Sequence, residues 1–179
     1  MKNFVIAALA AILIAGCGTS KRVVREKVYV PAPTAVTIQS TAPYQEGHRI
    51  KRNILEECTL DRALPGFVKQ YTIERNIDVE TVDKLDPAGS GANLVIEIAD
   101  AVSEGNAFIG HNKYTKIVGT LYQDGVKTAS FEAARHSSGG AFAGFKGSCS
   151  VLGRTVKTLG VDVAEWLSKP WKNAYLGDL

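Results

Sequence analysis

The fold is decided by the stretch CSVLGRTVKTLGVDVAEW, which runs from Cys149 to Trp166. Its apolar residues recur every three or four positions, as one face of an amphipathic α-helix requires; they are Cys149, Leu152, Val156, Leu159, Val163 and Trp166. Charged residues such as Arg154 and Glu165 fall on the other side. Gly160 costs this helix about 1 kcal/mol relative to alanine, so we expect a bend there. Pro170 ends the helix.

Three strands are predicted before this helix. Residues 94–99 are apolar and rich in β-branched side chains, which is typical of a buried strand. Residues 114–123 and 126–136 form two further strands, separated by Asp124-Gly125. This dipeptide favours a type I′ hairpin turn, because both central positions need a positive φ.

The region before residue 94 predicts a helix between two less regular stretches. Five apolar residues fall on one helical stripe: Leu60, Leu64, Phe67, Val68 and Tyr71. Asp61 can cap this helix, while Ile50 to Cys58 is interpreted as a strand and Asp78 to Asn93 as a loop. The order β-α-β-β-β-α predicts one small α+β domain, with a mostly antiparallel sheet and both helices on one face.

The first residues have the pattern of a signal peptide. Lys2 is followed by an apolar run from Phe4 to Ala15, which is too short to span a bilayer of about 30 Å as a helix. The run ends in Leu13-Ile14-Ala15-Gly16-Cys17, which resembles the lipobox of bacterial lipoproteins. The resemblance implies cleavage after residue 16 and acylation of Cys17, with chains such as palmitate. Two or more acyl chains give stable membrane anchoring.

The residue after Cys17 indicates in which membrane, inner or outer, the lipid anchor is inserted. It is Gly18 rather than aspartate, and the sequence in this respect is similar to the enterobacterial pattern for sorting to the outer membrane. We therefore expect a lipid anchor in the cell outer membrane, with the domain facing the periplasm.

Residues 17–47 are predicted to be the lipidated N-terminus and a flexible tether, followed by a periplasmic domain over residues 48–179. Pro31, Pro33 and Pro43 interrupt the tether, and no period of 3.6 or 2 persists. Thirty such residues reach at most about 100 Å. The basic residues near the anchor either attract anionic head groups or only solvate the chain; they are Lys21, Arg22, Arg25 and Lys27.

Composition and charge exclude some classes of protein. The 179 residues are 45% hydrophobic and 22% charged, which is ordinary for a globular protein. The net charge of +3 is too small to indicate a nucleic-acid-binding surface. We therefore expect no nucleic-acid partner.

Two cysteines remain once Cys17 is lipidated, namely Cys58 and Cys149. In an oxidising periplasm they predict a disulfide, which would stabilise the domain by about 4–5 kcal/mol in the chain-entropy model. The alternative is a reactive Cys149 thiol at the start of the last helix. No Cys-x-x-Cys motif supports that alternative.

A glycine-rich segment precedes the last helix. Its candidate contact residues are Gly139, Gly140, Phe142, Gly144, Phe145 and Gly147, and the positions between them are alanine or lysine. It lacks the spacing of a phosphate-binding loop. The segment is either a flexible connection or a contact loop for a partner.

Motifs for catalysis and metal binding are absent from the sequence. His48, His111 and His136 lie far apart, and no G-x-S-x-G or H-E-x-x-H motif occurs. We therefore expect no enzymatic activity, no metal and no cofactor.

Several short motifs carry a further resemblance. Residues 54–58 and Leu64-Pro65, together with residues 144–149 and Trp166-Leu167, resemble an uncharacterised group of small proteobacterial envelope lipoproteins. The resemblance covers the domain and implies no particular activity.

The function predicted from these features is that of a membrane-anchored accessory lipoprotein. It would bind or help assemble other envelope components, with an envelope protein as partner and the membrane contacted through the lipid anchor. The alternative is a lipoprotein that binds a small ligand, such as a lipid, a glycan or a metal. A third hypothesis, an envelope hydrolase or thiol enzyme, requires a free Cys149 or a catalytic site assembled from distant residues.

Overall fold

The computed structural model describes residues 26–106, 110–137 and 147–179. They form a single α+β domain, as predicted. The elements in chain order are β1 (Ala35–Gln39), α1 (Arg52–Glu57), α2 (Leu60–Ile73), β2 (Asp78–Val82), β3 (Ala92–Asn106), β4 (Gly110–Gln123), β5 (Val126–Ser137), α3 (Ser148–Ser168) and β6 (Ala174–Gly177).

The sheet is mixed rather than mostly antiparallel. Its strand order is β2-β1-β3-β4-β5-β6. The long strands β3, β4 and β5 form an antiparallel meander, in which Asp124 and Gly125 have the positive φ values of the predicted turn. The shorter strands β1, β2 and β6 join through parallel pairings. They escaped the sequence analysis, and the parallel part of the sheet was missed with them.

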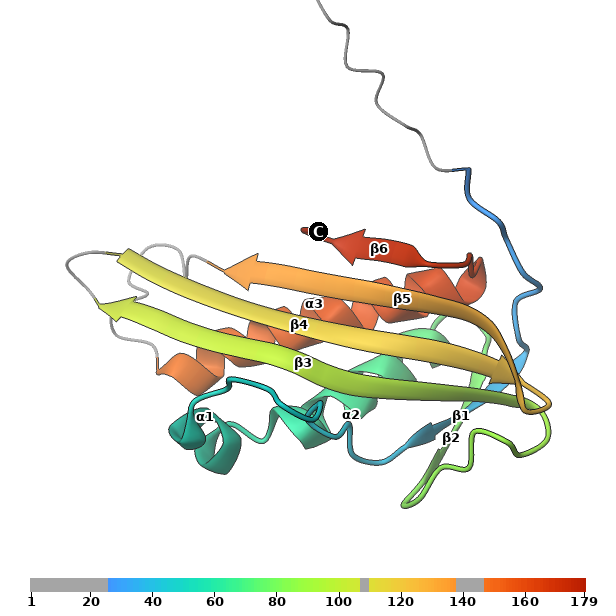
Figure 1. Ribbon diagram of the computed structural model, residues 1–179, viewed down its shortest axis with the longest axis horizontal. Helices are drawn as coiled ribbons and strands as arrows, with labels where there is room; N and C mark the ends of the chain where they lie inside the picture. The colour runs from blue at the N-terminus through green and yellow to red at the C-terminus, as the bar shows by residue number, and fades with distance from the viewer. Residues whose placement is uncertain (1–25, 107–109, 138–146) are drawn as a thin grey trace, which may run out of the picture.

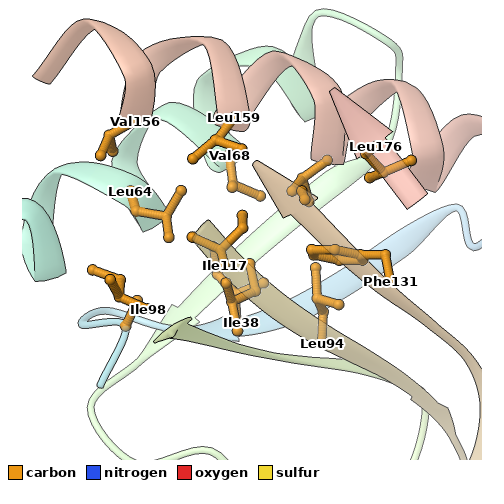
Figure 2. Close-up of a cluster of buried hydrophobic side chains, with 14 of the residues drawn as sticks. Ile38, Leu64, Val68, Leu94, Ile98, Ile117, Phe131, Val156, Leu159 and Leu176 are labelled. Atoms are coloured by element: carbon orange, nitrogen blue, oxygen red, sulfur yellow. The ribbon is translucent and has the colours of Figure 1, made fainter. Parts of the chain in front are cut away.

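The helices α2 and α3 lie behind the sheet in Figure 1 and cover one of its faces. Figure 2 shows the core between these layers, where side chains of the two helices point toward those of the strands; labelled among them are Leu64, Val68, Val156, Leu159, Ile98, Ile117 and Phe131. The predicted apolar stripe of α3 lies in this core: its residues from Leu152 to Trp166 are buried, and Cys149 is partly buried. The other face of the sheet carries no helix of the described residues.

The predicted strand from Ile50 to Cys58 is wrong, because α1 occupies this stretch. Ile50, Ile54 and Cys58 are all buried and lie four positions apart, which is a helical spacing. Arg52 and Glu56, also four positions apart, form an exposed ion pair of 2.6 Å. The i, i+4 pattern was present in the sequence, but the run is only nine residues long.

The domain begins earlier than the predicted boundary at residue 48. β1 lies inside the stretch interpreted as a flexible tether, with Val36 and Ile38 almost fully buried. The chain then continues along β3, where Ile98 donates a hydrogen bond to Pro43 and accepts one from Gln45. Pro33 and Pro43 flank β1 and lie outside it. The strand can therefore form, with its short alternation of buried and more exposed residues.

Strand β2 was likewise missed in the predicted loop from Asp78 to Asn93. It is an edge strand with one buried side chain, Val79, and its exposed residues include Glu80. Strand β6 follows Pro170 and buries Ala174 and Leu176. Both strands are too short to give a sequence pattern that stands out from a loop.

Candidate functional site

The predicted site residues are only partly covered by the structure. Cys17 lies outside the described residues. So do five members of the glycine-rich segment, namely Gly139, Gly140, Phe142, Gly144 and Phe145. The sixth, Gly147, is the N-cap of α3, and its backbone carbonyl accepts hydrogen bonds from the first turn of that helix.

The two remaining cysteines form a disulfide in the structure. Cys58 is the C-cap of α1 and Cys149 lies in the first turn of α3, with 4.8 Å between their Cα atoms. The bond fixes the corner between α1 and α2 to the start of α3. Neither sulfur is a thiol in this state, so a thiol-based activity would require prior reduction.

The face of the sheet that points away from α2 and α3 is here called the outer face. The strand register places Glu97, Val118, Glu132 and Tyr175 directly opposite one another, in a single row across β3, β4, β5 and β6. All but Tyr175 are half-buried, and Tyr175 is 56% exposed. Four strands therefore present one continuous row of side chains to the surroundings.

The centre of the outer face carries more carboxylates than ammoniums, and one of its lysines is Lys116. Lys116 forms a 2.6 Å ion pair with Glu132 of β5, and its cross-strand neighbour on β3 is Asp100. The hydrogen bond from Lys116 to Glu132 raises the pKa of the lysine. Glu97 lies in the next row and has no ion-pair partner within 4 Å among the described residues. The carboxylates of Asp100 and Glu97 therefore remain available to bind a cationic group.

Aromatic side chains surround this acidic centre. Tyr114 packs against His136 with 4.5 Å between ring centroids, and burial raises the pKa of the Tyr114 hydroxyl. Tyr122 lies toward the hairpin end of β4, and Tyr175 lies on the edge strand β6. Tyrosine provides a large contact area together with a hydroxyl group that can hydrogen-bond.

An open hollow of about 470 Å³ lies on the outer face beside β6. Its lining is largely polar and includes Glu97, Thr120, Lys127, Ser130, Glu132, Asn173 and Tyr175. Ser130 donates a hydrogen bond of 3.2 Å to Asn173 across the hollow's wall. The hollow offers carboxylates, hydroxyls and an amide beside an aromatic ring.

A second polar cluster is buried between the sheet and the start of α3. Lys113 is 4% exposed, and its ammonium donates to Ser103 Oγ at 2.5 Å, which in turn donates to Ser148 Oγ at 2.7 Å. No carboxylate of the described residues lies within 4 Å of this ammonium. The stretches outside the description contain no aspartate or glutamate. Among the described residues, the hydroxyl of Ser103 is the hydrogen-bond partner of this buried ammonium, and burying a charge with so little compensation is costly.

Neither the outer face nor the buried lysine was identified from the sequence. The signal for Lys113 was the alternation along β4, where Lys113, Thr115 and Ile117 share the inner face. The outer face depends on the registers of four strands, and β6 was not predicted. Carboxylates that are distant in the sequence therefore could not be brought together.

The described ranges contain no group of three histidine, cysteine or acidic residues placed to hold a metal ion. Within the same ranges, no helix has the length and hydropathy needed to cross a bilayer.

Comparison with known proteins gives only distant similarity. No model of a known protein family matches the sequence, and no curated protein matches it. The chain is similar to a solved minor lipoprotein from Acinetobacter baumannii, at 9% identity and a TM-score of 0.44, covering 77% of this chain and 97% of that one. It is also similar to PelC from Paraburkholderia phytofirmans, solved as a dodecamer, at 10% identity and a TM-score of 0.46, covering 76% and 96%. These comparisons identify no family for the chain, so its function has to be argued from its own residues.

Proposed function

We propose that the protein is a lipid-anchored accessory protein of the cell envelope, which binds another envelope protein through the outer face of its sheet. The support for the anchor is the sequence that ends at Cys17 and resembles a lipobox. The support for binding is the outer face itself. On this proposal the protein positions its partner and has no enzymatic activity.

The observation that carries the proposal is the composition of the outer face. The carboxylates of Glu97, Asp100 and Glu132 outnumber the ammoniums of Lys116 and Lys127 there, and tyrosines lie at the margins. Tyrosine is enriched in protein interfaces. An excess of carboxylates steers and orients a partner of opposite charge. The expected partner is therefore a protein surface that presents lysine or arginine side chains.

The engagement of one carboxylate favours binding over catalysis. Glu132 already forms a 2.6 Å ion pair with Lys116. A glycosidase would need both carboxylates of a pair available on either side of the scissile bond.

The proposal is tested by photo-crosslinking in the native envelope. A photo-reactive amino acid replaces Thr120, which is half-buried in the outer face, or Lys157, which is exposed on α3. We expect a discrete crosslinked product from position 120 and none from position 157. Equal products from both positions, or none from position 120, would contradict the proposal.

Charge reversal distinguishes the acidic centre from a general effect of charge. The crosslink from position 120 should be strongly reduced in a Glu97→Lys variant. It should be unchanged in Glu80→Lys, because Glu80 is exposed on β2, the edge strand at the opposite side of the sheet from β6, away from the acidic centre. Mass spectrometry of the product identifies the partner, which should contribute basic residues near the crosslink.

Binding of a small ligand is the alternative, and the polar hollow of about 470 Å³ favours it. Carboxylates, hydroxyls and an amide beside Tyr175 suit a polar ligand such as a glycan rather than a lipid chain. Native mass spectrometry of protein isolated from its own envelope tests this. A bound small molecule that is lost in Glu97→Lys, without a crosslinked protein, would replace the proposed function by this one.

The location in the cell is tested separately. We propose an outer-membrane anchor with the domain on the periplasmic side. Membrane fractionation should place the protein in the outer membrane, and Cys17→Ala should release it or leave it unprocessed. External protease should digest the domain only after the outer membrane is opened. Digestion in intact cells would reverse the proposed orientation.

A further inference from the structure

The described chain begins with an arm that is fastened to the segment after α3. Backbone hydrogen bonds of 2.9 Å run from Val30 to the carbonyl of Pro170 and from Lys172 to the carbonyl of Val28. We call the two paired segments, residues 27–30 and 169–172, the clasp. Figure 1 shows the arm (blue) descending past the end of the domain at which α3 ends and β6 begins.

Cationic and aromatic side chains alternate through the clasp. The Lys27 ammonium lies 4.1 Å from the centroid of the Trp171 ring, and the Lys169 ammonium lies 4.6 Å from that of Tyr29. The rings of Tyr29 and Trp171 meet edge to face at 6.2 Å. Each cation is thus held beside a ring from the opposite segment.

Two large hydrophobic side chains of the clasp are exposed. Val28 is 54% exposed and Tyr29 is 48% exposed. Among the described residues only six large hydrophobic side chains are exposed, and these two are adjacent to each other in the chain. A hollow of about 330 Å³ between Val28, Trp171 and Lys172 lies beside them. The backbone carbonyl of Trp171 accepts a hydrogen bond from the buried Trp166 side chain, which fixes the clasp to the core.

The clasp also lies close to the proposed anchor along the chain. Lys27 follows Cys17 by ten positions, which span at most about 35 Å. The intervening sequence includes Lys21, Arg22 and Arg25 and no acidic residue before Glu26. On the proposed anchor, the exposed Tyr29 ring, the half-buried Trp171 ring and the ammoniums beside them would therefore stay within about 35 Å of the membrane surface.

We propose that the clasp is a second membrane contact, which lies against the head groups of anionic phospholipids. Tryptophan and tyrosine favour the interface between lipid and water, where their apolar and polar parts are both satisfied. Lysines beside them are attracted to a negative lipid surface. The contact would orient the domain on its lipid anchor. The inference rests on the proposed anchoring at Cys17 and not on the proposed binding by the outer face, although the hollows of the two surfaces share Asn173 and Tyr175.

The two tryptophans of the chain provide the measurement. Trp166 is 1% exposed in the core, whereas Trp171 belongs to the clasp. The lipidated full-length mature protein is reconstituted into vesicles of phosphatidylcholine alone, or of phosphatidylcholine with phosphatidylglycerol. Each vesicle type contains brominated lipids, which quench only tryptophan that reaches the bilayer. Flotation of the vesicles reports anchoring in the same samples.

We expect roughly twofold or more quenching in the anionic vesicles relative to the neutral ones. Replacing Lys27, Lys169 and Lys172 by glutamine should abolish this difference. A matched triple variant at the exposed lysines Lys51, Lys84 and Lys157 should retain it. Trp171→Phe should remove the quenched signal, because the remaining tryptophan is buried. Val28→Asp, a single exposed change, should weaken quenching in a chain whose far-UV spectrum is unchanged.

The outcomes separate this proposal from the proposed anchor. Protein that floats with both vesicle types but shows equal quenching in them overturns the clasp as an anionic-lipid contact. Quenching that survives the clasp substitutions does the same. Protein that fails to float with either vesicle overturns the anchor at Cys17 instead.

Discussion

Gly160 of α3 faces Phe67 of α2 at a distance that leaves no room for a side chain. A Cβ atom at Gly160 would lie 2.6 Å from Phe67 Cβ and 3.0 Å from the Phe67 carbonyl carbon. The two helices therefore pack with their backbones close together at this point. The glycine that weakens α3 as an isolated helix is what allows α3 to approach α2.

Gly160→Ala is therefore expected to destabilise the protein, although alanine is the better helix former. Forcing a methyl group into a packed contact costs about 1–3 kcal/mol. Gly153→Ala is the matched control in the same helix, because a Cβ there meets no atom within 4 Å. It should stabilise by up to about 1 kcal/mol. Urea unfolding of both variants measures the two effects, and shifts of the same sign would contradict the packing argument.

Removal of the disulfide should produce the largest loss of stability. The bond closes a loop with a sequence separation of 91 residues, so Cys58→Ser with Cys149→Ser should lower the free energy of unfolding by about 4–5 kcal/mol. Urea unfolding with and without reductant measures it. Reductant should destabilise the wild type and have no effect on the double variant. An unchanged wild type in reductant would mean that the bond contributes nothing.

Asp178, which follows β6, should make stability depend on acid pH. Its carboxylate accepts hydrogen bonds from the His136 backbone N–H at 2.8 Å and from Arg135 at 2.9 Å. The His136 hydrogen bond, together with the Arg135 charge, lowers the pKa of Asp178 below its ordinary value of 3.8. The stabilisation is thus complete above the ordinary pKa and is lost as the pH falls through the lower folded-state value.

We expect the wild type to have a higher Tm than Asp178→Asn between pH 5 and 7, which are conditions well above about 4. The difference should shrink steadily below about pH 4 as the carboxylate becomes protonated. Thermal unfolding of both proteins across this range checks it. A Tm difference that grows on acidification would have the wrong sign for a carboxylate whose pKa is lowered.

Lys113 should prove unfavourable for stability. Its ammonium is buried with only the hydroxyl of Ser103 as a hydrogen-bond partner among the described residues. Lys113→Met keeps the volume and removes the charge, so it should leave stability unchanged or raise it by about 1–3 kcal/mol. Ser103→Ala should instead lower it by about 1–3 kcal/mol, because the charge stays without its partner. Urea unfolding of both variants and of the double variant measures the coupling. A loss in Lys113→Met would show that the lysine itself stabilises the fold.

The elements predicted correctly are those whose pattern is local. The stripe from Leu152 to Trp166 repeats over about four turns of α3, and the Asp124-Gly125 turn lies between two strands that alternate throughout. In these stretches the residues near one another in sequence determine the structure by themselves.

The parts that were missed depend on partners that lie far apart in the sequence. β1 is stabilised by pairing with β2 and β3, more than forty residues later. The contact between Tyr29 and Trp171 joins the two ends of the described chain. The row from Glu97 to Tyr175 exists only once four registers are set. None of these long-range pairings leaves a periodic signal in the sequence.

The interior position of β1 has a consequence for the order in which the chain can fold. β1 is the first strand to leave the ribosome or an export channel, yet both of its neighbours in the sheet follow much later. The clasp then requires Trp171, almost the last residue. A partly translocated chain lacks the later strands that pair with β1. It therefore cannot form these long-range contacts or complete its sheet. On the proposed route to the envelope, this topology would leave the sheet incomplete until nearly all of the described residues had crossed the membrane.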